Sequence, residues 1–382
     1  MQFQKIEIRK EALKPYDVFE ARANTAVRGL NRLRGALRRG GHKGRYDDLA
    51  YEFRGGAKDE LRKKHYDKSL RLLWKAEEHL PFTSFRDCTR EEKAMMQMAD
   101  TALKQDERKE LERFRSADYK ALLDREYTQA EKQAIVNILS TIGHGEAYAW
   151  MVASQILPDV QSTGARAAVT MQVLEEAKHF VVLRELIAAF DCEIPRMSAW
   201  EYATLERILT MDGLEKFFGM NVVVEGLALS LFGMMSSLPG LEVLRLFHLD
   251  ESRHTALPGN YFKEFPMTKW EQYNPAAQLR RFSLIAPALP IFIQLERDLA
   301  ELGIDSFEFG GSMVRKILHL ADRVGFRLPL STAQIQKLVN RGFNEHCMKS
   351  RPNFTPRDFF AAETTKGKRE LDVEREVFQI SA

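Results

Sequence analysis

The chain has few cysteines and little net charge, and each shortage excludes a class of protein. Its 382 residues include only Cys88, Cys192 and Cys347, too few and too widely spaced for a disulfide framework or a cysteine-ligated cluster. The net charge of +3 provides no global field for binding nucleic acid. We therefore expect a cytoplasmic protein of a reducing compartment that does not bind nucleic acid.

Targeting and membrane signals are also scarce. The first ten residues, MQFQKIEIRK, are charged and lack the apolar core of a secretory signal. One long apolar run, residues 217–241, carries Glu225 as its only charge and ends with Pro239 and Gly240. Because a carboxylate is costly in lipid, this run predicts a buried core helix and not a transmembrane one.

Strand signals are few, and apolar residues recur at three- and four-residue spacing, so the sequence predicts an all-α fold. Capping-box patterns at Thr128–Glu131 and Ser198–Glu201 mark two helix starts. We expect Pro258 and Gly259 to end the last of four main helices. The predicted helices cover about residues 128–156, 163–190, 198–236 (with a break near Asp212) and 240–257. The predicted regions are a basic helical N-terminal extension (1–125), a central bundle (126–265) and a helical C-terminal extension with a polar tail (266–382).

Two of these helices contain Glu-x-x-His. Glu176 precedes His179 in EEAKHF, and Glu251 precedes His254 in LDESRH. About one such pair is expected by chance in a chain of this size, so a single pair carries little weight. Residues i and i+3 share a helix face and lie about 4.5 Å apart along the axis, so a carboxylate and an imidazole there can share one metal ion.

The other two helices each carry a glutamate in an apolar setting. Glu146 lies in GHGEAYAW, 30 residues before Glu176, and Glu225 lies in NVVVEGLALSLF, 26 residues before Glu251. A buried, unpaired carboxylate is costly, so these groups must be neutralised, paired or bound to a cation. About thirty residues complete one long helix, a turn and the return to the same depth. The sequence therefore predicts that six side chains meet in the middle of the bundle.

In its order and spacing this set resembles the ferritin-like di-iron carboxylate superfamily, in which two helices each give a Glu and two give Glu-x-x-His. The resemblance covers about residues 128–260 and is strongest to acyl-carrier-protein desaturases and related oxygenases, through LEEAKH and LDESRH. It implies a ferritin-like four-helix bundle that binds two iron ions, or manganese with iron, and uses O2 as co-substrate. The implied ligands are Glu146, Glu176, His179, Glu225, Glu251 and His254.

The resemblance also implies a role for the acid that precedes each paired glutamate. Asp250 would accept a hydrogen bond from His179, and Glu175 from His254, each reaching the histidine of the opposite pair. The alternative is that both acids face solvent. Apolar residues and three glycines near the ligands would form a dry pocket with room for O2 or substrate. These are Ile142, Ala149, Trp150, Leu183, Val222, Ala228, Leu229 and Phe247, with Gly143, Gly145 and Gly226.

Within the superfamily, the sequence favours an oxygenase or desaturase acting on a hydrophobic substrate that is either free or linked to a carrier protein. A ribonucleotide reductase small subunit would have its radical tyrosine where Leu183 stands. An N-oxygenase acting on an amine is an alternative, although its third histidine would occupy the position of Phe247 and His248 is one residue away. A ferroxidase or bacterioferritin-type store is the other alternative, and the long extensions argue against a storage shell. The threonine that often assists oxygen activation is replaced here by Ala228 and Leu229.

Partners follow from what turnover would need. The chain has no cysteine-rich cluster and no Gly-x-Gly-x-x-Gly motif, so we expect an external electron donor, a ferredoxin or a flavin reductase. Residues 28–45 hold seven Lys and Arg, including Arg38 and Arg39, and no acid. They form either a solvated helix face or a dock for an acidic partner such as acyl carrier protein or ferredoxin. The apolar residues 282–293 are expected in the core or in a homodimer contact.

Overall fold

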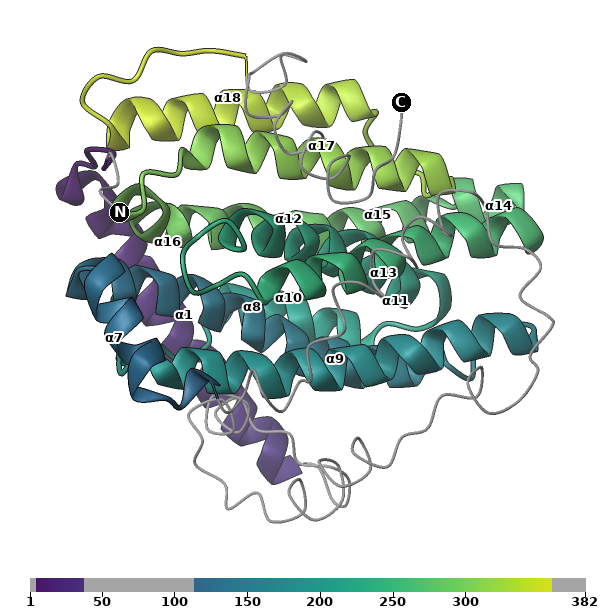
Figure 1. Cartoon of the computed structure of the whole chain (residues 1–382). Coiled ribbons are helices and arrows are strands. Elements are labelled where there is room, and N and C mark those ends of the chain that lie inside the picture. The colour runs from purple at the N-terminus through teal and green to yellow at the C-terminus, as the bar shows by residue number, and fades with distance from the viewer. Residues whose placement is uncertain (1–4, 38–112, 359–382) are drawn as a thin grey trace.

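The structure of the chain is a computed structural model that describes residues 5–37 and 113–358 (Figure 1). Every element within these ranges is helical, which confirms the all-α prediction. The elements are α1 (Lys10–Leu37), α7 (Ala117–Glu126), α8 (Gln129–Ile156), α9 (Thr163–Ala189), α10 (Ala199–Thr210), α11 (Gly213–Phe218), the π-helix η2 (Gly219–Val224), α12 (Glu225–Met235), α13 (Leu244–Glu264), α14 (Lys269–Tyr273), α15 (Pro275–Ile285), α16 (Ala288–Glu301), α17 (Ser306–Val324) and α18 (Thr332–Ser350).

Local capping chemistry sets the starts of the central helices. Thr128 and Ser198 form the predicted capping boxes with Glu131 and Glu201, so α8 and α10 begin where expected. The break near Asp212 is also present, because Gly213 has a φ of +55°. The predicted helices over 128–156, 163–190 and 198–236 are therefore confirmed.

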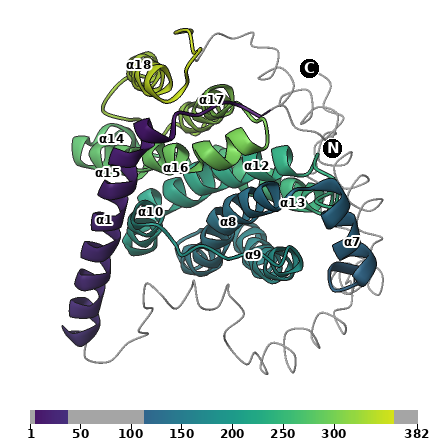
Figure 2. The same ribbon diagram turned by 90° about the vertical axis from the view of Figure 1, so that its left-hand side faces the viewer.

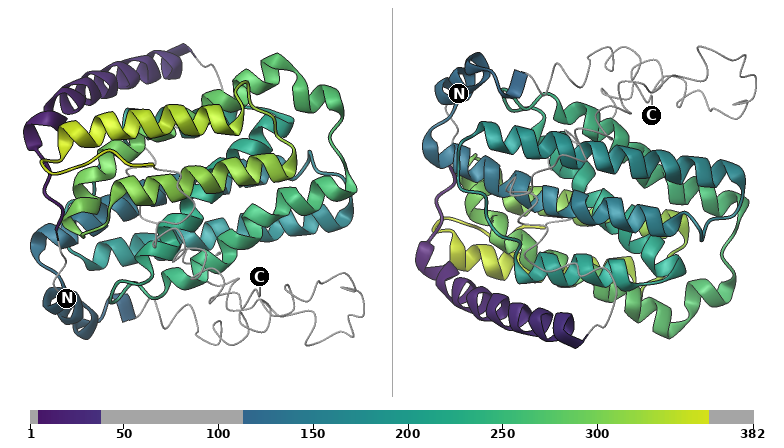
Figure 3. Two further views of the ribbon diagram at one scale, coloured as in Figure 1. Left: turned by 90° about the horizontal axis from the view of Figure 1, so that it is seen from above. Right: turned by 90° about the horizontal axis from the view of Figure 1, so that it is seen from below.

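The helices stack in layers. α8 packs against α9 and α12 packs against α13, while α13 also contacts α9. End-on, α16 and α17 cover this group and α18 lies outermost (Figure 2). Seen from above, α17 and α18 run side by side over the other helices (Figure 3). A single cluster of buried apolar residues extends from Phe114 to Cys347 and joins these layers, and the division at residues 125 and 265 stays a prediction.

The long apolar run is a core element. Within the described residues, Gly213–Met235 is the one stretch long and apolar enough to cross a membrane, and 83% of its apolar window is buried. That burial agrees with the predicted core helix of a soluble protein. The sequence did not predict that its middle, η2, forms a wide π-turn directly before Glu225. Such turns are rare and occur often at functional sites.

The predicted limits of the fourth helix were wrong at both ends. α13 begins at Leu244 and not at Gly240, whose φ of +86° lies outside the helical region. It then continues through Pro258 to Glu264. A proline lacks the N–H that would bond the carbonyl four residues earlier, here that of His254. The Asn221 amide in η2 donates to that carbonyl at 3.1 Å, so the helix survives the missing bond.

The two remaining predicted segments are only partly described. α1 packs against α10 and α18, and it ends at Leu37, so Arg38 and Arg39 lie outside the described residues. Leu30 and Leu33 of α1 are exposed. In the apolar segment 282–293, Leu284, Ile285 and Phe292 are buried, which agrees with the core alternative.

The π-turn gives a test of packing. A Cβ on Gly219 would lie 2.8 Å from Ile208 Cγ1 and 3.2 Å from Leu284 Cδ1. We expect Gly219→Ala to lower the free energy of unfolding by about 1–3 kcal/mol through overpacking. Gly342→Ala in α18 is the control, because no atom lies within 4 Å of its added Cβ. Chemical denaturation measures both, and equal stabilities would contradict the close approach at Gly219.

Candidate metal centre

The six predicted ligands meet at one place in the core. They form two groups that share Glu176 and Glu251, one completed by Glu146 and His179 and the other by Glu225 and His254. Within each group the ligand atoms all lie within 4.8 Å of one another. None of the six residues is more than 3% exposed. α8, α9, α12 and α13 supply them, as the spacing along the chain predicted.

Each histidine turns its Nδ1 towards the carboxylates. His179 Nδ1 lies 3.0 Å from Glu251 Oε1, 3.2 Å from Glu146 Oε2 and 3.8 Å from Glu176 Oε2. One ring N–H can satisfy only one of these three oxygens. Two ligand atoms about 2.1 Å from the same ion at a right angle are about 3 Å apart, so this crowding suits a shared cation.

The other half has the same arrangement. His254 Nδ1 lies 3.0 Å from Glu251 Oε2, 3.1 Å from Glu176 Oε1 and 3.6 Å from Glu225 Oε1. The two ring centroids are 6.2 Å apart. Glu176 and Glu251 therefore each present one oxygen to either histidine, as carboxylates do when they bridge two adjacent ions.

Unsatisfied oxygens provide a further test of whether cations fit here. Glu176 Oε2 and Glu251 Oε1 are buried and accept no well-aligned hydrogen bond from the described residues, although Glu251 Oε1 lies 3.0 Å from His179 Nδ1. A buried carboxylate oxygen without a donor is costly, and a metal ion would satisfy it. Four carboxylates also balance the charge of two divalent ions. The residues present fit a pair of metal ions.

The far side of each imidazole contacts an acid from the opposite helix. His179 Nε2 lies 3.0 Å from Asp250 Oδ2, and His254 Nε2 lies 2.8 Å from Glu175 Oε2. Burial opposes ionisation of Asp250, but Lys178 and His179 hold its pKa well below the usual range. The ionised acid accepts a hydrogen bond from Nε2–H, so Nδ1 is the nitrogen that would bind a metal. These are the cross-helix pairs that the resemblance implies.

Two basic side chains neutralise the two acids. Arg253 donates to Glu175 at 2.5 Å and also to Asp250. Lys178 donates to Asp250 at 2.8 Å. The Arg253 side chain is 40% exposed, so it connects both histidine–acid pairs to the surface. The outer charges, two acids and two bases, therefore cancel without any metal.

Two site residues escaped the sequence reasoning. Gln172 donates to Glu225 Oε1 at 2.6 Å and to Glu176 Oε1 at 3.5 Å. Asn221 donates to Gln172 Oε1 at 3.0 Å. Each lies four residues before a predicted ligand on the same helix face, Gln172 before Glu176 and Asn221 before Glu225. A polar residue at that offset was the available signal.

The surroundings agree only in part with the predicted pocket lining. Trp150 is 40% exposed, so the prediction that it lines the site was wrong. Trp150 lies on the outer side of α8, and its ring packs beside Phe180. Gly226 faces α17, since a Cβ there would lie 3.2 Å from Ile317 Cγ1. Phe247 stacks on His179 with ring centroids 4.3 Å apart.

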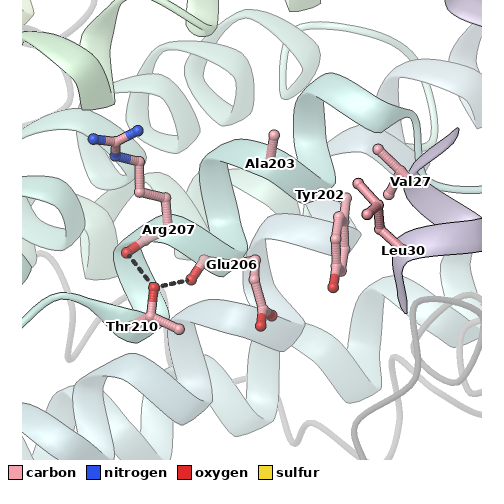
Figure 4. Close-up of a pocket in the computed structure, with 7 residues that line it drawn as sticks. All are labelled: Val27, Leu30, Tyr202, Ala203, Glu206, Arg207 and Thr210. Carbon is pink, nitrogen blue, oxygen red and sulfur yellow. Dashed lines mark hydrogen bonds between the residues drawn. The ribbon is translucent and has the colours of Figure 1, made fainter. Parts of the chain in front are cut away.

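A separate pocket of about 310 Å³ opens between α1 and α10 (Figure 4). None of its lining residues belongs to the Glu/His cluster, so it does not serve that site. They are Val27, Leu30, Tyr202, Ala203, Glu206, Arg207 and Thr210.

Comparisons with known proteins add no family. No protein-family model, no curated protein and no solved structure matches this chain. The case for a metal centre therefore depends on the side chains themselves.

In the metal-free cluster, burial and neighbouring charges favour protonated forms of four of the six groups. Burial, with the nearby Glu176 charge, raises the pKa of Glu146 and Glu225 well above their usual values. Burial would lower the pKa of His179, but hydrogen bonds to Asp250 and Glu146 outweigh it and leave the pKa well raised. Burial likewise opposes the His254 charge, and Glu251 and Glu176 raise that pKa.

These shifts predict how the stability of the metal-free protein depends on pH. A histidine whose pKa rises on folding contributes stability that is full below its unfolded pKa of about 6.5 and is lost as pH rises through the folded pKa. The raised pKa of Glu146 and of Glu225 acts in the same direction. We expect the metal-free Tm to fall from about pH 7 to about pH 9, and the metal-loaded Tm to hold. Scanning calorimetry tests this, and a metal-free Tm that rises over the range would contradict it.

Removing Arg253 or Lys178 should reduce metal affinity in two different ways. Arg253→Met removes a donor shared by both histidine–acid pairs, so we expect both stepwise metal affinities to fall about 10–100-fold. Lys178→Met is the matched comparison: Lys178 donates its hydrogen bond to Asp250, the partner of His179, so this variant should weaken one step. Anaerobic calorimetry with ferrous iron measures both. Unchanged binding in Arg253→Met would show that the acids hold the imidazoles unaided.

Proposed function

We propose that the chain is a cytoplasmic non-haem di-iron oxidoreductase with a ferritin-like four-helix bundle. In this proposal it uses O2 to oxygenate or desaturate a hydrophobic substrate. Delivery of that substrate by an acidic carrier protein would require the basic segment 28–45 to act as the docking site. When bound, two ferrous ions supply the electrons that reduce O2 beside a C–H, C=C or N–H group.

The observation that carries the proposal is the sharing of Glu176 and Glu251. Each carboxylate spans from one histidine to the other, and each has a buried oxygen that accepts no well-aligned hydrogen bond from the described residues. A single ion would use only one of the two groups. The two groups have four residues each and share two carboxylates, so they support two neighbouring ions.

Protein residues would set the conditions at this centre. Glu146 and Glu225 complete the two groups from α8 and α12. Asp250 and Glu175 orient the imidazoles by accepting hydrogen bonds from their Nε2–H groups. Phe247 stacks on His179 and Phe232 meets the same ring edge-on at 6.0 Å, which keeps water from one side of the centre. A dry, oriented ligand set favours redox chemistry over simple ion exchange.

Iron content tests the proposal and separates an enzyme from a store. We expect the protein, reconstituted anaerobically and desalted, to hold two irons per chain and, when reduced, to consume about one O2 per iron pair. Glu225→Ala should lose at least one iron. Ser230→Ala, also buried in α12 and bonded to the Gly226 carbonyl, is the control and should retain both.

Other iron contents would refute this reading. Many irons per chain would favour the ferroxidase or storage alternative, and none would refute the metal centre.

The electron donor is a separate part of the proposal. We expect sustained O2 reduction from NADPH only when a ferredoxin with its reductase, or a flavin reductase, is added. The measurement is oxygen uptake over many turnovers with and without that protein. Sustained uptake with NADPH alone would contradict the requirement for a partner.

A further inference from the structure

The two halves of the centre differ four residues before each ligand glutamate. In one half these positions hold Asn221, before Glu225, and Gln172, before Glu176. In the other half they hold Ile142, before Glu146, and Phe247, before Glu251. All four side chains are at most 4% exposed. Of these four, Gln172 contacts Glu225, which completes one metal position, and Phe247 stacks on His179, which completes the other.

The direction of the amide contacts follows from one backbone carbonyl. The His254 carbonyl can only accept, so Asn221 must present its NH2 group, at 3.1 Å. The second N–H of that group donates to Gln172 Oε1 at 3.0 Å. Gln172 must then turn its own NH2 towards Glu225, at 2.6 Å. No other amide orientation pairs every donor with an acceptor.

Pro258 makes that carbonyl available. In an unbroken α-helix the N–H of residue 258 would bond the carbonyl of His254, and proline has none. Both Gln172 and Asn221 are at most 1% exposed, so water does not compete for the contacts. The proline in α13 thus sets the orientation of an amide on α9 through an amide in η2.

We propose that Pro258, Asn221 and Gln172 form a positioning relay that holds Glu225 and makes the two metal positions unequal. The relay rests on the di-metal centre proposed above. The position completed by Glu225 and His254 has a fixed amide donor on its terminal carboxylate. The position completed by Glu146 and His179 has the Phe247 ring instead.

Removing the relay should weaken one metal position selectively. Gln172→Leu deletes the donor to Glu225, so we expect one of the two stepwise ferrous affinities to fall about 10–100-fold while the other holds. Ser230→Ala, a buried α12 variant that removes only the hydrogen bond to the Gly226 carbonyl, is the control and should change neither affinity. The measurement is anaerobic calorimetric titration of the full chain with ferrous iron. Equal losses at both steps, or none, would overturn the relay.

A second pair of variants separates positioning from stability. Asn221→Leu should lower the same affinity and also the Tm of the metal-free protein, because the His254 carbonyl is left buried without a donor. Adding Pro258→Ala restores the helical N–H, so the double variant should regain Tm but not affinity. Recovery of both would assign Asn221 a structural role only and overturn the relay.

The wild-type titration keeps the two proposals apart. Fewer than two irons per wild-type chain would refute the metal centre itself, and the relay with it. Two irons bound with unchanged affinities in Gln172→Leu would refute the relay alone.

Discussion

Burial of four carboxylates beside two imidazoles is the constraint on which the rest of this structure depends. Glu146, Glu176, Glu225 and Glu251 are at most 2% exposed and converge within a few ångströms of one another. Removing such charges from water is costly unless counter-charges occupy the same space. Protons can neutralise them in the metal-free protein, as the raised pKa values of Glu146, Glu225 and both histidines indicate. Two divalent cations would neutralise them more completely.

The surrounding fold separates the charged groups into an inner cluster of six side chains and an outer set of acids and bases. The outer acids, Asp250 and Glu175, are balanced by Lys178 and Arg253, so they add no net charge to the core. The inner carboxylates have no lysine or arginine partner among the described residues, and their basic neighbours are His179 and His254. The layers formed by α16, α17 and α18 cover one side of the central helices, and the apolar cluster from Phe114 to Cys347 excludes water. The protein thus keeps the charge balance of the inner cluster, which depends on protons or cations, separate from that of the outer acids and bases.

Local rules predicted much of this arrangement. The capping boxes at Thr128 and Ser198 fixed two helix starts, since the hydrogen bonds involved lie within three residues. The six cluster residues could be found because isolated charges in apolar helices stand out. Their spacing also placed them at matching depths. The resemblance supplied the cross-helix acids, and the structure places Asp250 and Glu175 against the expected imidazoles.

The remaining features depend on contacts that no local rule contains. Pro258 normally ends a helix, but α13 continues because Asn221, 37 positions earlier, supplies the missing donor. The π-turn of η2 and the outward direction of Trp150 likewise depend on how neighbouring helices pack. Gln172 was overlooked because a glutamine in a helix is ordinary, and only its burial beside Glu225 gives it meaning.

The contrast between Phe247 and Gln172 has a consequence for how the centre could be assembled. If the two metal positions are chemically distinct, a protein with one ion bound contains it at one defined position and not as an equal mixture of two forms. A second ion added afterwards would then enter the remaining metal position. In the proposed di-metal centre, the order of filling would then be decided by a ring on α13 and an amide on α9.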